Sequence, residues 1–229
     1  MKNIFFIGIL FITLLSSAQN IVNKNLGDFS ILKVYNGIEL ELIKANQQKI
    51  EITGAKSEMV KIKNVDGTLK LSLPFSLTPE NNVAEGKILI KLYYSKSINV
   101  IDANEGATIT GKNFNQDKVA VNAQERAFIN LTTESKFLTV RASSGGIVKL
   151  SGTTKNQDVD VDLYGIYHGY NLKTVNSLTV KSGTGAKAEV FAGETLNAKV
   201  NFGGTIFYKG NPEVIKDKRV IGGIIKKKD

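Results

Sequence analysis

The sequence repeats itself between Ile98 and Tyr208 with a period of about 20 residues. Successive repeats begin at intervals of 21, 19, 21, 19 and 18 residues, at Ile98, Val119, Leu138, Val159, Leu178 and Leu196. Two residues later a second apolar position follows, at Val100, Val121, Val140, Val161, Val180 and Ala198. Further along each repeat lies another apolar column, made of Ile109, Ile129, Val148, Tyr170, Ala188 and Ile206. Such a period indicates a stacked architecture in which no repeat buries its apolar side alone.

Within each repeat, apolar and polar residues alternate, as they do from Leu138 to Ala142. A period of two is the pattern of a half-buried strand. Flexible glycine-containing corners separate the two strands of a repeat, for example Ser144-Gly145-Gly146. The sequence therefore predicts an all-β, parallel β-solenoid with coils of about 20 residues. An antiparallel sandwich is the alternative, and the constant register over six repeats favours the solenoid.

The N-terminus has the composition of a signal peptide, which we expect to span residues 1–18. Lys2 supplies the positive charge, Ile4–Leu15 the apolar segment, and Ser16-Ser17-Ala18 the small residues before cleavage. A membrane anchor is the alternative, but the apolar segment is shorter than the roughly 20 residues of a spanning helix. We therefore expect an exported protein in the periplasm, on the outer cell surface or secreted, with no transmembrane segment after cleavage.

The remaining chain is predicted to be one domain over residues 28–229, preceded by a linker over residues 19–27. Residues 28–95 read as a base of N-terminal strands, residues 96–210 as the regular coils, and residues 211–229 as a C-terminal cap with a basic tail. Antiparallel pairing in the base is expected from the hairpin signal Asp66-Gly67, and a separate small domain is the alternative. The segment Pro74–Gly86 is predicted to be a loop.

Several points of sequence together resemble the auto-transporter adhesin head GIN domain family, which consists of exported bacterial proteins. They are Phe29-Ser30-Ile31-Leu32-Lys33-Val34, Asn36-Gly37-Ile38, Asp66-Gly67-Thr68-Leu69, Ser143-Ser144-Gly145-Gly146, Ser182-Gly183-Thr184-Gly185 and Tyr208-Lys209-Gly210-Asn211-Pro212. The resemblance implies a right-handed parallel β-solenoid and a role as an adhesin-like head, and it supplies no catalytic residues. The corner Ala123–Ala127 departs from the pattern because it lacks glycine, so a less regular coil is expected there.

Catalytic and metal motifs are scarce, because the chain has one histidine and no cysteine. A zinc site, a redox cysteine pair or a histidine-dependent triad is therefore impossible or depends on His168 alone. No phosphate-binding glycine motif occurs, and no cofactor is expected.

The best candidate ligand surface is a cluster of aromatic residues around that histidine. We predict Tyr164, Tyr167 and His168 as its members, since tyrosine offers a flat apolar face and a hydroxyl that suit sugars and protein interfaces. Tyr170 falls in the inward column of the repeat, so we expect at least one of the tyrosines to lie in the core. A surface histidine in a turn, without a ligand, is the simpler alternative for His168.

A calcium site is a further hypothesis, because Asp158, Asp160 and Asp162 alternate along one predicted strand. Alternate positions are about 6.5–7 Å apart, and calcium takes several oxygen ligands. A solvated strand face is the alternative. A lyase-like use of these carboxylates would need a basic residue opposite them, which the sequence does not place.

The formal net charge is +9, and it becomes +8 once Lys2 is removed. Outside the cytoplasm this suggests affinity for anionic surfaces, not nucleic acid. The alternative is that outward lysines (Lys149, Lys173, Lys181 and Lys199) only keep the solenoid solvated. We expect a non-enzymatic binding module for a surface glycan or an envelope protein. A periplasmic structural or envelope-stress domain without extracellular ligand is the alternative, and a polysaccharide-active enzyme is a weaker one.

Overall fold

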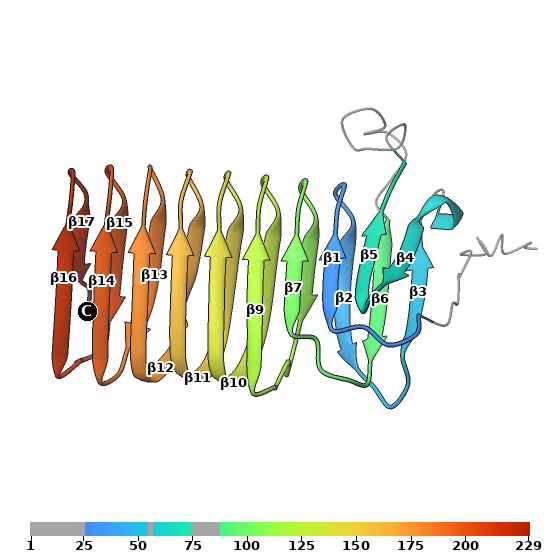
Figure 1. The fold of residues 1–229 in the computed structure, drawn as a ribbon, viewed down its shortest axis with the longest axis horizontal. Coiled ribbons are helices and arrows are strands. Elements are labelled where there is room, and N and C mark those ends of the chain that lie inside the picture. Colours follow the sequence, from blue (N-terminus) through green and yellow to red (C-terminus); the bar gives the residue numbers. More distant parts are fainter. Residues whose placement is uncertain (1–25, 55–56, 75–87) are drawn as a thin grey trace, which may run out of the picture.

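The computed structural model describes residues 26–54, 57–74 and 88–229. The predicted signal peptide and most of the predicted loop Pro74–Gly86 lie outside these residues. The described chain is nearly all strand and forms a β-solenoid of about 7 turns, with parallel stacked coils of about 19 residues. Figure 1 shows the coils side by side along one axis, so the predicted solenoid is confirmed.

Two ladders of strands form the two faces of the solenoid (Figure 1). The first face runs through β5 (Thr68–Ser72), β1 (Ile31–Val34), β7 (Val100–Ala103), β9 (Lys118–Ala123), the second halves of β10 (Phe128–Ala142), β11 (Ile147–Val161) and β12 (Ile166–Ser182), β14 (Thr195–Val200) and β16 (Val214–Arg219). The second face runs through β6 (Leu89–Tyr94), β2 (Glu39–Lys44), β8 (Thr108–Gly111), the first halves of β10, β11 and β12, β13 (Lys187–Ala192), β15 (Thr205–Lys209) and β17 (Ile224–Lys227). All pairs within these two ladders are parallel.

The N-terminal base is continuous with both ladders, because its strands β3 (Lys49–Thr53) and β4 (Lys61–Val65) pair with one strand of each ladder. β3 pairs antiparallel with β6, and β4 pairs antiparallel with β5, with a short 3-10 helix (Ser57–Met59) between β3 and β4. The predicted hairpin is confirmed, since Asp66 and Gly67 both have positive φ in the β4–β5 turn. The coil made of β1 and β2 lies between the coil of β5 and β6 and the coil of β7 and β8. The order of these three coils along the axis therefore differs from their order in the sequence.

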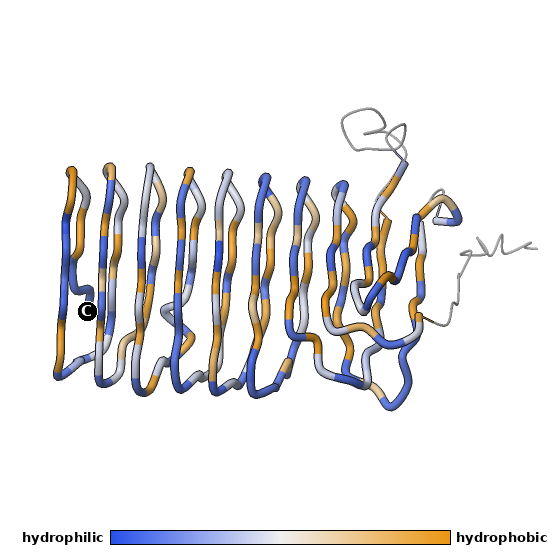
Figure 2. Tube along the Cα trace, in the orientation of Figure 1, coloured by the Kyte–Doolittle hydropathy of each residue, from blue (hydrophilic) through white to orange (hydrophobic). Residues whose placement is uncertain are grey.

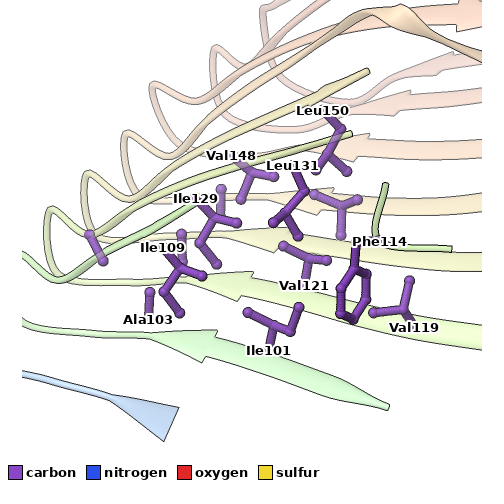
Figure 3. Close-up of a cluster of buried hydrophobic side chains, with 14 of the residues drawn as sticks. Ile101, Ala103, Ile109, Phe114, Val119, Val121, Ile129, Leu131, Val148 and Leu150 are labelled. Atoms are coloured by element: carbon purple, nitrogen blue, oxygen red, sulfur yellow. The ribbon is translucent and has the colours of Figure 1, made fainter. Parts of the chain in front are cut away.

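The core lies between the two faces and consists of aliphatic side chains stacked coil on coil. Figure 3 shows Ile109, Ile129 and Val148 in successive coils, and the same three residues are paired in the second ladder. Each is completely buried. A buried aliphatic side chain of this kind stabilises a fold by about 1.5–3 kcal/mol relative to exposure.

Both predicted columns of the first face need correction. Val159 pairs with Val140, so Gln157 is the residue that pairs with Leu138. The apolar pattern put a long interval of 21 residues between Leu138 and Val159. In the structure, the long interval lies one coil later, between Gln157 and Leu178, because the pairing of β11 with β12 contains two register shifts. In the first repeat, Ile101 pairs with Val121, so Val100 is not in the inward column.

Corners between the first and second faces share one backbone conformation. The two residues at the apex have positive φ in most of them, as at Ser144 (φ 51) and Gly145 (φ 74). The glycine-free corner is also regular, since Glu125 (φ 53) and Arg126 (φ 63) adopt the same conformation. Arg126 N–H donates to the carbonyl of Ser144 in the next coil. The expected irregularity at Ala123–Ala127 is therefore absent.

Residues 211–229, expected to be a C-terminal cap with a basic tail, continue both ladders as one more coil. β16 continues the first ladder from β14, and β17 continues the second from β15. Ile215 pairs with the buried Leu196 but is itself 48% exposed, because no further coil of the described chain covers it.

Candidate functional site

A bulge in β12 creates a groove on the outer side of the second face. Gly169 and Lys173 pair with Val190 and Phe191, which are consecutive residues of β13, so three residues of β12 are left without partners there. Of these three, Leu172 is buried, whereas Tyr170 is half-buried and Asn171 is exposed. A bulge turns side chains out of the regular alternation of a strand.

The groove has a volume of about 250 Å³ and is lined by Lys149, Leu150, His168, Tyr170, Asn171 and Glu189. This volume is smaller than that of a typical pocket for a drug-sized molecule, which starts at about 300 Å³. The groove therefore suits one sugar ring or one side chain of a partner, and we call it the bulge groove.

A carboxylate with two basic neighbours forms the floor of the bulge groove. Glu189 Oε2 lies 2.7 Å from His168 Nδ1, and its Oε1 lies 2.5 Å from Lys187 Nζ. Partial burial of Glu189 would raise the pKa of its carboxyl, but the hydrogen bonds from Lys187 and His168 hold that pKa below its usual value. Glu189 is thus a fixed, ionised acceptor at neutral pH.

Tyr170 forms the aromatic wall of the bulge groove. Lys209 Nζ lies 5.4 Å from the centre of its ring, in a cation–π contact that holds the ring in place. Burial, and secondarily the charge of Glu189, raise the pKa of the Tyr170 hydroxyl. The hydroxyl is therefore neutral at physiological pH and can donate a hydrogen bond.

Tyr167, predicted to lie at the ligand surface, is instead completely buried. It pairs with Val148 and Ala188 and so occupies the column position that the repeat pattern assigned to Tyr170. Its hydroxyl accepts a hydrogen bond of 2.6 Å from Gln157 Nε2. The structure thus exchanges the expected roles of Tyr167 and Tyr170, and only His168 and Tyr170 share a site.

Tyr164, the third residue of the predicted cluster, lies apart from the bulge groove at a corner apex. It is 68% exposed, and a Cβ added at Gly185 would lie 2.6 Å from its ring, so the ring covers the corner of the next coil. The sequence proximity of Tyr164 to His168 therefore does not place them in one site.

The three aspartates of the calcium hypothesis do not converge. Asp160 pairs with Arg141 on one side and Lys181 on the other. Asp162 Oδ1 accepts hydrogen bonds from the backbone N–H groups of Leu163 and Thr184, both of 2.8 Å. Within the described ranges, no group of three or more histidine or acidic side chains is arranged to hold a metal ion.

A second groove on the same face was not predicted from the sequence. It has a volume of about 480 Å³ and is lined by Glu39, Leu40, Glu41, Glu51, Thr53, Leu89, Ile90, Lys91, Thr108 and Thr110. Hydrogen bonds from Lys49 and Tyr93 lower the pKa of the Glu51 carboxyl. Alternating glutamates at residues 39 and 41 were the only signal, because the antiparallel pairing that adds Glu51 is not visible in the sequence.

Comparison with protein families gives one match over most of the chain. The model of the family described as "Putative auto-transporter adhesin, head GIN domain" matches residues 28–212. No protein of curated function matches the chain.

Solved structures share the fold at low sequence identity. A putative adhesin from Bacteroides fragilis aligns with a TM-score of 0.83 and 20% identity, over 93% of this chain and 98% of that one. A putative adhesin from Parabacteroides merdae aligns with a TM-score of 0.65 and 18% identity, over 93% and 98% of the two chains. A protein from Parabacteroides distasonis described as a putative lipid binding protein aligns with a TM-score of 0.62 and 15% identity, again over 93% and 98%. In the part of this chain that the structure describes, no helix is long and apolar enough to span a membrane.

Proposed function

Because the chain belongs to the auto-transporter adhesin head GIN domain family, we propose that it is an exported, non-enzymatic binding module whose bulge groove binds a glycan. The observation that carries this proposal is the placement of Tyr170. Its ring stands at the surface beside an ionised carboxylate, an imidazole and a primary amide.

This combination of groups suits a sugar better than an apolar ligand. The ring of Tyr170 offers a flat surface for the C–H groups of a pyranose. Glu189 accepts hydrogen bonds from hydroxyl groups, whereas Asn171 both donates and accepts them. Lys149 adds a positive charge at the rim, which favours an acidic sugar.

Three alternatives remain distinct from this proposal. The same groove could receive a side chain of an envelope protein, which is the protein-binding form of the adhesin role. A periplasmic structural domain would have no ligand in the groove. An enzyme acting on polysaccharides is the weaker alternative, and turnover of an acidic polysaccharide would support it.

Glycan-array binding of the purified chain tests the proposal. We expect Tyr170→Ala and Glu189→Gln each to weaken binding to the best glycans by about tenfold or more, which corresponds to about 1.4 kcal/mol. The matched control is Tyr164→Ala, which removes an exposed tyrosine outside the groove and should leave glycan binding unchanged.

The proposal fails if the unmodified chain binds no glycan on the array, or if the groove variants bind as well as Tyr164→Ala. Protease treatment of intact cells, with a periplasmic marker as control, separates the first two alternatives. Protection of the protein until the outer membrane is opened would favour the periplasmic structural domain.

A further inference from the structure

Five exposed apolar side chains line one edge of the solenoid near its C-terminal end. They lie at three corners between the first and second faces, and their exposed fractions are 49% for Leu163, 68% for Tyr164, 62% for Phe202, 48% for Val220 and 59% for Ile221. We call this row the apolar ridge. Figure 2 shows hydrophobic residues at these corners, along the upper edge of the view.

The ring of Tyr164 makes the apolar ridge continuous. The corner between the Tyr164 and Phe202 coils consists of small residues, Gly183-Thr184-Gly185, and would otherwise interrupt the row. The Tyr164 ring lies over Gly185, whose added Cβ would meet it at 2.6 Å. Coils are about 4.8 Å apart, so the ridge is about 14 Å long from the Leu163 coil to the Ile221 coil.

Three residues of the apolar ridge have a backbone conformation that disfavours bulky side chains. Leu163, Tyr164 and Phe202 have φ values of 47°, 63° and 46°, in the left-handed region that disfavours bulky side chains. At the same edge, the corners of the N-terminal half carry Asn36, Glu105 and Glu125, and Figure 2 shows those corners as hydrophilic. The left-handed conformation is common to the corners, so the apolar character of the residues is what distinguishes the C-terminal corners from the N-terminal ones.

A row of lysines runs beside the apolar ridge on the first face. Lys181 pairs with Lys199, and Lys199 pairs with Lys218, so three like charges are directly adjacent in the ladder. Like charges at directly opposed positions destabilise a sheet. Among the described residues, no ion pair is formed by any of these three side chains, which we call the lysine row.

We propose that the apolar ridge and the lysine row together bind the surface of a lipid bilayer that contains anionic headgroups. The ridge side chains enter the boundary between headgroups and acyl chains, where aromatic and aliphatic residues are favoured. The lysines contact lipid phosphates with their ammonium groups while their aliphatic stems lie along the ridge. This surface is separate from the bulge groove, so the inference does not depend on the proposed function.

The shape and charge of the surface favour a bilayer over a protein. The ridge is a convex edge. A protein partner would need a preformed groove of matching length to receive it, whereas the lipid headgroups of a bilayer can rearrange around it. A second copy that packed ridge against ridge with its first face on the same side would place its own lysine row beside the first, and the two rows would repel each other.

Co-sedimentation with vesicles tests this proposal. We expect the chain to bind vesicles of equal parts phosphatidylglycerol and phosphatidylcholine, and to bind pure phosphatidylcholine far more weakly. The triple variant Leu163→Ser/Phe202→Ser/Ile221→Ser should lower the partition coefficient by about tenfold or more. Lys199→Gln should lower the partition coefficient by about fivefold. A higher salt concentration should also lower it, because salt screens the attraction between lysines and phosphates.

Matched controls lie on the opposite edge of the coils. Phe137→Ser removes an apolar side chain that is 54% exposed, and Lys155→Gln removes an exposed lysine, and neither should change vesicle binding. The variants share residues 1–25, so a difference in vesicle binding between them reports on the substituted side chains. Tyr170→Ala should leave vesicle binding intact even where it abolishes glycan binding.

The proposal is overturned if no vesicle is bound, if phosphatidylcholine is bound equally well, or if the ridge variants bind like Phe137→Ser. Light scattering without vesicles tests the alternative that a second copy of the chain binds to the ridge. A change of oligomeric state in the ridge triple variant, with vesicle binding unchanged, would identify the ridge as an interface between copies.

Discussion

At the scale of single residues, the most constrained group is the buried polar network around Tyr167. Gln157 donates to the Tyr167 hydroxyl at 2.6 Å and accepts a hydrogen bond of 2.9 Å from Thr174 Oγ1. All three residues are buried. The Tyr167 ring also occupies the space above Gly169, where an added Cβ would lie 2.4 Å from it. Removal of one polar partner leaves the others without compensation in a medium of low dielectric constant.

We therefore predict that Tyr167→Phe lowers the free energy of unfolding by about 1–3 kcal/mol, because the Gln157 amide loses its acceptor. Chemical denaturation measures this loss. The triple variant Tyr167→Phe/Gln157→Leu/Thr174→Val is the control, and it should recover part of the stability because all three members of the network become apolar. A triple variant that is less stable than Tyr167→Phe would contradict this account.

The same tyrosine predicts how stability changes in alkali. Burial raises the pKa of the Tyr167 hydroxyl above the value of about 10 that it has in the unfolded chain. The unfolded chain thus releases this proton first, so the stabilising contribution is complete below pH 10 and is lost as the pH rises beyond it. Denaturation between about pH 9 and 11.5 should show that the free energy of unfolding falls more steeply with pH for the native chain than for Tyr167→Phe. Equal slopes would mean that Tyr167 ionises while folded.

At the scale of the element, the backbone conformation of the corner explains which positions require glycine. Both apex residues adopt left-handed conformations, and the N–H of the second donates to the next coil, as from Gly145 to Leu163. A Cβ at Gly145 would meet only Arg126 Cγ, at 3.5 Å, so space is available there. The requirement at this corner is conformational, since left-handed backbone costs about 1–2 kcal/mol for a residue with a Cβ.

Two substitutions in adjacent corners should therefore have opposite effects. Gly145→Ala is expected to lower the free energy of unfolding by about 1–2 kcal/mol, because alanine must adopt φ near 74°. Arg126→Gly should raise it or leave it unchanged, because glycine relieves the same conformation at φ 63°. Thermal or urea denaturation of both variants provides the measurement, and stabilisation by Gly145→Ala would refute the conformational account.

At the scale of the whole molecule, the stack of coils makes stability depend on position along the axis. Inner coils contact a neighbour on each side, whereas the coil of β16 and β17, within the described part of the chain, pairs only with that of β14 and β15. Every residue of β16 is exposed, even those that continue buried columns. Stacked repeats are stabilised by nearest-neighbour interfaces, so a terminal coil can open without the rest.

We expect hydrogen exchange to show this gradient. Backbone amides of β16 should exchange faster than those of β14, although both sets are bonded to a neighbouring strand. Ile215→Ser should accelerate exchange in β16 and leave β9, several coils away, unchanged. Uniform exchange along the axis would indicate that the molecule opens as one cooperative unit instead.

The sequence alone determined the parallel solenoid, its period and most of its strands, because these follow from alternation along the chain and from turn residues at fixed spacing. It could not determine which tyrosine faces outward. The polar Gln157 interrupts an apolar column and the bulge in β12 shifts the register, so a count of apolar positions assigned Tyr170 to the core and left Tyr167 at the surface. The tertiary structure decided the surfaces for which we propose binding. The bulge groove, the apolar ridge and the lysine row each combine residues about 20 positions apart, and their contact depends on how one coil registers against the next.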